Sequence, residues 1–234
     1  MPLFKTKGIV LKKQEYGECD EIISLLSPDY GKIKVIVKGV RKVKGSQVGK
    51  FELFSEVSLL LARGRNIEKC MQAQLLAPHS GLREDLVRLS YGLYYLELFD
   101  RFLPFSEPHP SLYRLIKKAL HLLEEELEPE LLSVLLLYHF LKALGYEPSL
   151  THCAECGDSE VLRRFSPSQG GLCCGNCLGS SRGSLAVDEE VLTLLRVLPG
   201  TSLKRLRSLG GGRTGQGEQG AFWKATPSGI FQGS

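Results

Sequence analysis

Four cysteines are the residues of this sequence whose types and spacing point most directly to chemistry. Cys153 and Cys156 form one Cys-x-x-Cys pair, and Cys174 and Cys177 form a second pair after seventeen intervening residues. Two intervening residues make a turn tight enough for both sulfurs to reach one ion at about 2.3 Å. Four thiolates complete a tetrahedral shell and leave no position for water. The spacing therefore predicts a structural Zn²⁺ site.

Several alternatives use the same cysteines. Cys173 could replace Cys174, although a two-residue loop is the commoner geometry. An iron site, a redox dithiol or a catalytic metal are the other options, but the chain lacks the usual iron–sulfur spacings and the H-x-E motif of zinc deaminases. Nearby cations also leave a contact with nucleic acid open; these are Arg163, Arg164 and Arg182. We favour a clip that holds a long loop on a helical domain.

The second candidate site is a run of cations in the alternating segment 32–38. Because successive side chains of a strand point to opposite faces, Lys32, Lys34 and Lys38 are expected to share one outward face. A glycine-bounded loop follows with three more cations, which are Arg41, Lys42 and Lys44. We interpret these six residues as DNA contacts, since each phosphate they neutralise adds salt-dependent affinity. The alternative is an edge strand whose lysines block aggregation.

The elements around the cations predict a small barrel. Residues 1–50 hold eleven lysines and arginines against five acidic residues, which favours a polyanionic partner. Turn residues separate five short segments rich in β-branched and apolar residues, which are 8–13, 21–27, 32–38, 51–62 and 67–76. Five strands are too few for a sandwich and suit a barrel of the oligonucleotide-binding type. We assign residues 1–78 to this domain.

The elements around the cysteines predict helices. Leucines recur at three- and four-residue spacing after Pro78, and again after Pro110. A third run, 131–144, is apolar nearly all round, starts after Pro129 and stops at Gly145. We therefore expect an α+β, multi-domain protein, with a helical domain at 79–209 and a zinc-binding insertion at 153–177. Residues 210–234 hold eight glycines without a period and are expected to be a disordered or atypical tail.

Composition and motifs exclude several classes of function. The apolar fraction of 43% is ordinary for a globular protein. The N-terminus lacks the apolar run of a secretion signal, and no apolar segment is long enough to span a membrane. We therefore expect a cytoplasmic, nucleoid-associated protein with reduced thiols and no membrane partner. No catalytic triad, carboxylate pair or phosphate-binding loop is visible, so we expect no enzymatic activity.

With these residues assembled, the chain resembles the bacterial RecO family of recombination mediators. The resemblance covers about residues 5 to 200 and lies in the order of its motifs, which are 6–11, 16–22, 39–42, 44–46, 144–148, 153–157, 165–167 and 170–172. The family usually ends in further helices, whereas this chain turns glycine-rich after Leu209. The resemblance therefore does not extend to the helices that complete the helical domain in the family.

The resemblance implies a DNA repair factor. A RecO-like protein has an oligonucleotide-binding barrel, a helical domain and a structural zinc site. It binds single- and double-stranded DNA, anneals complementary strands and, with RecR, helps RecA load onto single-stranded DNA coated by single-strand-binding protein (SSB). The implied partners are DNA, RecR and the C-terminal tail of SSB. A zinc-stabilised adaptor without DNA binding, or a zinc enzyme acting on nucleic acid, are the other functions consistent with the sequence.

Overall fold

The structure is a computed structural model that describes residues 2–41, 47–125, 128–159, 161–177 and 183–203. Its contacts divide the chain into two compact units, Met1–Ser133 and Val134–Ser234. This division differs from the expected boundary after residue 78, because the first two helices pack against the barrel. The glycine-rich tail at 210–234 lies outside the described residues.

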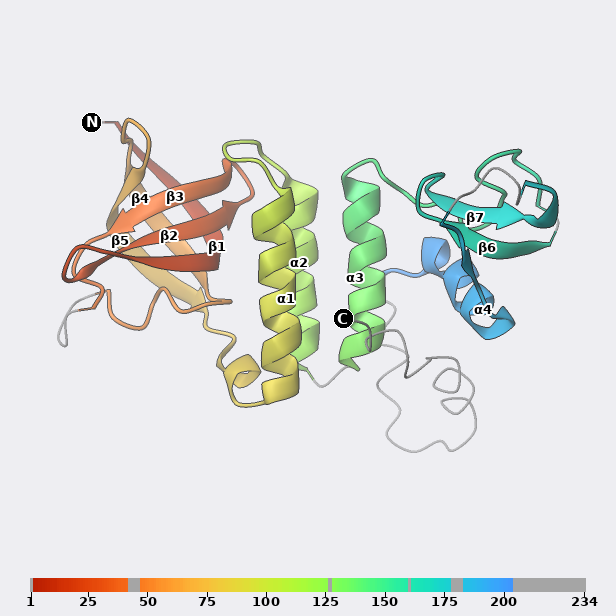
Figure 1. Cartoon of the computed structure of the whole chain (residues 1–234). Coiled ribbons are helices and arrows are strands. Elements are labelled where there is room, and N and C mark those ends of the chain that lie inside the picture. Colours follow the sequence, from red (N-terminus) through yellow and green to blue (C-terminus); the bar gives the residue numbers. More distant parts are fainter. Residues whose placement is uncertain (1, 42–46, 126–127, 160, 178–182, 204–234) are drawn as a thin grey trace. The chain divides into compact units, whose positions relative to one another are not determined.

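Five strands close into a barrel in the first unit (Figure 1). The strands are β1 (Leu3–Tyr16), β2 (Asp20–Ser27), β3 (Gly31–Val37), β4 (Glu56–Ala62) and β5 (Glu68–Ala77). They neighbour one another in the order β1-β2-β3-β5-β4, and β4 returns to pair with β1. The β3–β5 pair is parallel and short, whereas all the others are antiparallel. The predicted fold class, an α+β protein that begins with a five-stranded barrel, is confirmed.

The long first strand closes the barrel. Its first half pairs with β4 and its second half with β2, and the register shifts between Val10 and Lys12. Such a bulge bends and twists a strand, which lets one strand serve two neighbours around a small barrel. The interior is filled by β-branched and aliphatic side chains from every strand, including Val10, Ile23, Val35 and Leu59.

The segment before β4 differs from the expectation of a strand from Phe51. Residues 51–55 form turns, and β4 begins at Glu56. Phe54 has a positive φ of 75° and is fully buried. Its ring lies against Gly92, where an added Cβ would stand 3.0 Å from a ring carbon. The apolar residues here thus pack the barrel against a helix, which a strand pattern does not anticipate.

Helices α1 (Leu86–Phe102) and α2 (Pro110–Glu124) lie side by side next to the barrel (Figure 1). A short 3₁₀ turn, η1 (Ser80–Arg83), precedes them. The Asp85 carboxylate accepts hydrogen bonds from the N–H groups of Val87 and Arg88 and caps α1. Pro110 occupies the first turn of α2, where no intrahelical N–H bond is lost.

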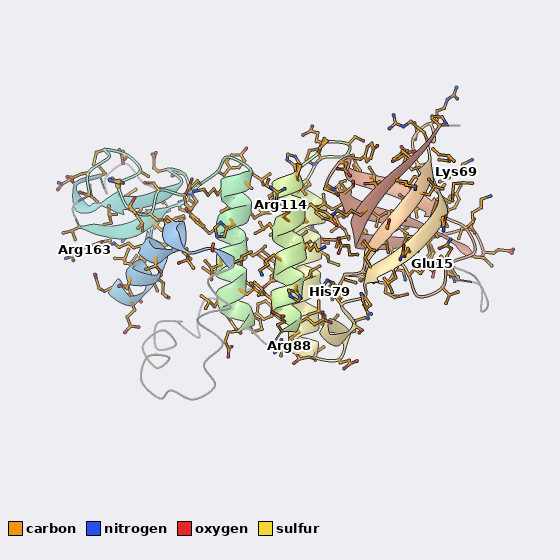
Figure 2. The ribbon with its side chains drawn as sticks, turned by 180° about the vertical axis from the view of Figure 1, so that it is seen from behind. Glu15, Lys69, His79, Arg88, Arg114 and Arg163 are labelled. Carbon is orange, nitrogen blue, oxygen red and sulfur yellow. The ribbon has the colours of Figure 1, made fainter. Side chains whose placement is uncertain are left out.

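Two carboxylates attach α2 to its surroundings. Glu56 of β4 is 3% exposed, and it accepts hydrogen bonds from Tyr113 Oη at 2.6 Å and Lys117 Nζ at 2.9 Å. Burial raises the pKa of Glu56, but these two donors outweigh burial and hold the pKa below its usual value. At the other end of α2, Glu124 contacts His79 Nδ1 at 2.7 Å (His79 is labelled in Figure 2). Each pair joins segments far apart in the sequence, which fixes α2 on the barrel unit.

Helix α3 (Pro129–Ala143) follows, and a small sheet lies further along the chain. Strands β6 (Leu162–Ser166), β7 (Gly171–Cys174) and β8 (Leu185–Ala186) form this three-stranded sheet in the order β7-β6-β8. The 3₁₀ turn η2 (Gly175–Cys177) follows β7, and helix α4 (Glu189–Val197) comes after β8 and is followed by the 3₁₀ turn η3 (Leu198–Gly200). The sequence predicted an insertion here but not its strands. Among the described residues, no helix has the length and apolarity needed to cross a membrane.

Candidate nucleic-acid interface and metal centre

The lysines in and just after β3 differ in their exposure to solvent. Ile33, Val35 and Val37 point into the barrel core, as the alternation predicts. Lys34 and Lys38 are exposed. Lys32, in contrast, is only 5% exposed. The expected outward exposure of Lys32 is therefore wrong, although its place in the alternation is right.

Lys32 is buried because helix α1 and the segment after it cover this end of β3. Its ammonium lies 3.4 Å from the Asp100 carboxylate and donates to the Asp100 carbonyl. It also lies 4.3 Å from the centre of the Phe105 ring. An ammonium taken out of water is stabilised only when such partners surround it. Lys32 thus holds α1 on the barrel and is not available to a phosphate.

Strand register adds a cation that the linear sequence did not single out. Lys12 of β1 pairs with Ser24 of β2, and Ser24 pairs with Lys34 of β3. Directly paired residues share a face, and neighbouring strands lie about 4.8 Å apart, so Lys12 and Lys34 stand about 10 Å apart on the outer surface. The Lys12 side chain is 62% exposed and contacts Asp100 only at 4.0 Å. Only knowledge of the β1–β2 and β2–β3 registers could have found it.

A second row on the same surface is partly apolar. Ile22 and Ile36 pair across β2 and β3 and are half-buried. The exposed Gln14 and Lys69 continue this row on β1 and β5 (Lys69 is labelled in Figure 2). We call the exposed cations of the two rows and of the end of β3 the cation face; its members are Lys12, Lys34, Lys38 and Lys69. Ammonium groups beside apolar surface suit a polymer that carries both phosphates and bases.

The loop after β3 is attached to the β1–β2 turn. The Gly39 N–H donates to Asp20 Oδ1 at 2.8 Å, and the Arg41 N–H donates to the Cys19 carbonyl at 3.1 Å. Arg41 is exposed, and its guanidinium pairs with Glu15 at 2.9 Å. An exposed pair of this kind contributes little, so Arg41 can exchange Glu15 for another anion. The two remaining predicted contacts, Lys42 and Lys44, lie outside the described residues.

The four cysteine sulfurs gather in the second unit. The sulfurs of Cys153, Cys156, Cys174 and Cys177 all lie within 4.8 Å of one another. Those of Cys156 and Cys174 are 3.7 Å apart. The edge of a tetrahedron with metal–sulfur bonds of 2.3 Å is about 3.8 Å, whereas a disulfide requires about 2.05 Å. The distances therefore fit four ligands of one ion, and each of these cysteines is free of disulfide bonds.

Local backbone geometry sets the two halves of this group. Gly157 has a φ of 77°, and its N–H donates to the Cys153 carbonyl at 2.9 Å, which closes the first turn. The second pair begins on β7, where Cys174 lies opposite Leu162 of β6. Neighbouring side chains of a strand point to opposite faces, so Cys174 joins the group while Cys173 is buried elsewhere.

The ionisation of the cysteines also fits a bound cation. Burial raises the pKa of Cys153, but N–H donors of Cys156, Cys174 and Glu155 outweigh it and bring the pKa to about 6. Hydrogen bonds with the Cys156 and Cys174 sulfurs raise the pKa of Cys177. One thiolate thus forms readily, whereas Cys177 resists ionisation in such close contact with the other sulfurs. A cation among them favours the charged form of all four.

The nearby arginines have different surroundings. Arg163 is exposed on β6 (Figure 2), whereas Arg164 is tied to Ser184 through a hydrogen bond of 2.9 Å. The module is joined to the segment before it by backbone bonds between Ser149 and both Gly170 and Leu172, at 3.0 and 2.8 Å. These bonds close the segment from Ser149 to Leu172, which carries the first cysteine pair, into a loop; the role of a clip stays a prediction. Arg182 lies outside the described residues.

Comparison with known proteins gives one consistent result. A family model described as the N-terminal part of recombination protein O matches residues 1–79, and one for its C-terminal part matches residues 83–216. A protein named DNA repair protein RecO from Symbiobacterium thermophilum is 33% identical over 86% of this chain and 81% of its own length. Relatives of the same name from Cutibacterium acnes and Alkaliphilus metalliredigens are 34% and 32% identical, over 85% and 88% of this chain and 82% and 85% of their own lengths.

Proposed function

Because the chain belongs to the RecO family of DNA repair proteins, we propose that it binds single- and double-stranded DNA and anneals complementary strands. Its role is then that of a non-enzymatic mediator: with RecR, it helps RecA load onto single-stranded DNA coated by SSB. RecR and the C-terminal tail of SSB are its proposed protein partners, and the cytoplasmic nucleoid is its proposed location. Residues 1–78 are the proposed DNA-binding domain, and residues 79–209 the proposed helical domain.

The observation that carries this proposal is the cation face on the outer surface of β1, β3 and β5. Lys34 of β3 and Lys38, in the turn just after β3, are four residues apart and exposed, and Lys12 of β1 lies on the same face as Lys34. A strand rises about 3.3 Å per residue, so residues four apart lie about 13 Å from each other, which is roughly twice the spacing of successive phosphates on one DNA strand. Contacts to phosphates hold a strand without engaging its base edges, which annealing requires. Arg41 is a further proposed contact, and Lys42 and Lys44, which lie outside the described residues, are proposed from the sequence alone, whereas Lys32 is excluded by its burial.

The cysteine group supports a structural Zn²⁺ as the cofactor. Cys153, Cys156, Cys174 and Cys177 would fill the four positions of a tetrahedral ion and leave none for a substrate or water. The ion supplies cross-linking of the loop and no catalytic step. The chain's own residues then bind and hold DNA through charge.

The test is strand annealing combined with salt-dependent binding. The triple variant Lys34→Ala, Lys38→Ala, Arg41→Ala should slow annealing and weaken oligonucleotide binding. The plot of log affinity against log salt concentration should become less steep, by the amount that about three phosphate contacts contribute. A matched control removes the same charge from exposed cations of other elements, which are Arg114, Lys142 and Arg196.

The control should keep the wild-type slope. Equal losses in both triple variants would contradict the cation face. No binding by the wild-type protein at any salt concentration would favour the adaptor function instead.

A further inference from the structure

The segment that follows α1 lies along the strand that carries the cations. Phe105 forms an isolated bridge with Lys32 of β3, and the Ser106 N–H donates to the Lys32 carbonyl at 2.9 Å. Strand β5 pairs with β3 only at Val35 and Ile36, so the segment occupies the edge of β3 before that point. The backbone of Phe105 is therefore positioned by the barrel itself and not only by its own helix.

Two features of the backbone show that the surrounding structure enforces the position of this segment. Ser106 has a φ of 63°, a backbone conformation that residues other than glycine rarely adopt. On the strand opposite, a Cβ on Gly31 would stand 1.9 Å from the Glu107 carbonyl oxygen, so only glycine permits this approach. Strained residues persist when the surrounding structure enforces them, and they cluster at binding sites.

The side chain that this arrangement presents is an exposed aromatic ring. Phe105 is 45% exposed, whereas its neighbour Leu103 is 2% exposed and anchors the segment in the core. The Phe105 ring centre lies 5.0 Å from Lys34 Nζ and 4.3 Å from Lys32 Nζ. A half-exposed phenylalanine contributes less to packing than a buried one, yet the backbone is strained to hold it beside a member of the cation face.

We propose that Phe105 is a stacking platform for an unpaired base, which makes single-stranded DNA the preferred ligand of the cation face. This inference rests on the proposed function. The phosphates would lie on Lys34 and its neighbours while one base of the same strand stacks on the ring. Aromatic stacking of this kind tolerates any base, because every base has a π-face. Bases of a duplex are already stacked on one another, so the ring adds little to duplex binding.

Charge decides between the two occupants that an exposed aromatic ring could take. The exposed Lys34 ammonium lies 5.0 Å from the centre of the Phe105 ring, and the exposed Lys12 lies on the same face of the sheet. These favour a ligand that is both anionic and aromatic over an apolar side chain of a partner protein. Ordering of one base on each bound strand would also leave the remaining bases free to pair.

The first experiment compares Phe105→Ala with Phe105→Leu and Phe105→Tyr, using fluorescence anisotropy with oligothymidine and with a duplex of equal length. Phe105→Ala and Phe105→Leu should weaken single-strand binding about tenfold, while Phe105→Tyr should keep it. Duplex affinity and the salt slope should not change, because no cation is removed. Equal losses for both DNA forms, or no loss for Phe105→Leu, would overturn the proposal.

The second experiment places a reporter at the site. The chain has a single tryptophan, Trp223, so the double variant Phe105→Trp, Trp223→Phe carries its only indole beside β3. Oligothymidine should quench its emission, whereas an abasic oligomer of the same length and charge should bind without quenching. Binding of oligothymidine without quenching would overturn the stacking platform and leave the cation face intact. A wild-type protein that binds neither oligomer would instead contradict the proposed function.

Discussion

The cysteine group and the cation face both gather several charged or ionisable side chains, but they do so by different routes. The cysteines need two short turns and one hairpin, and all four lie within 25 consecutive residues. The cation face joins Lys12, Lys34 and Lys69, which come from three strands; Lys12 and Lys69 are 57 positions apart in the sequence. A site encoded by neighbouring residues can be predicted without knowing the rest of the fold. A site assembled by register depends on every strand, and on whatever packs over them.

The largest effect is expected when the cysteine group, the locally encoded site, loses one of its ligands. Cys174→Ala removes one ligand of the proposed Zn²⁺, whose binding to such sites contributes on the order of 10 kcal/mol to folding. We expect zinc, measured by metal analysis, to fall from one ion per chain to none, and residues 150–187 to become sensitive to protease. The control Cys173→Ala should keep the ion.

Loss of zinc in the Cys173→Ala control, with retention in Cys174→Ala, would exchange the roles of the two residues. DNA binding by the barrel should remain in both variants, since its strands close without the cysteines.

A smaller effect tests what holds the helices on the barrel. Glu56→Gln should lower the free energy of unfolding by about 2 kcal/mol at pH 7, because Tyr113 and Lys117 then lose a charged acceptor. The folded-state pKa of Glu56 lies below 4.5, so its contribution is present above that pH and is lost as the pH falls through the folded pKa. Urea unfolding at several pH values measures this.

The difference between wild type and Glu56→Gln should therefore shrink below pH 4.5. Glu97→Gln, in an exposed pair with Arg101, is the control and should change stability by only a few tenths of a kcal/mol. A difference that grows in acid would contradict the direction of the pKa shift.

The last test separates two lysines that the sequence treats alike. Lys32→Met should reduce stability by about 1–3 kcal/mol, because it leaves the Asp100 carboxylate without its nearer ammonium partner, and should not alter the salt slope of DNA binding. Lys34→Met should leave stability nearly unchanged, weaken binding a few-fold and reduce the salt slope by about one contact. Thermal unfolding and oligonucleotide titration on both variants decide the matter. The opposite pattern would reverse the assignment of the two residues.

Much of this molecule could be predicted from local patterns. The alternation of residues 32–38 correctly placed Ile33, Val35 and Val37 in the core, and the proline and glycine signals located α2 and α3 within a few residues. The strand expected from Phe51 failed because Phe54 is apolar for a different reason: it fills the space beside Gly92 of α1. The three-stranded sheet around the cysteines was missed because β8 has only two residues, too few for a period.

By itself, the sequence determined the features that depend on neighbours along the chain: the strand and helix periods, the turns at glycine and proline, and the two Cys-x-x-Cys pairs. Only the tertiary structure decided which outward side chains meet water. Alternation assigns a lysine to a face, but the packing of α1 over that face buries Lys32 and leaves Lys34 exposed. The same packing brings Phe105 to the edge of β3, 73 residues after the strand's lysine at position 32. Burial is a property of contacts between distant segments, and no local period encodes it.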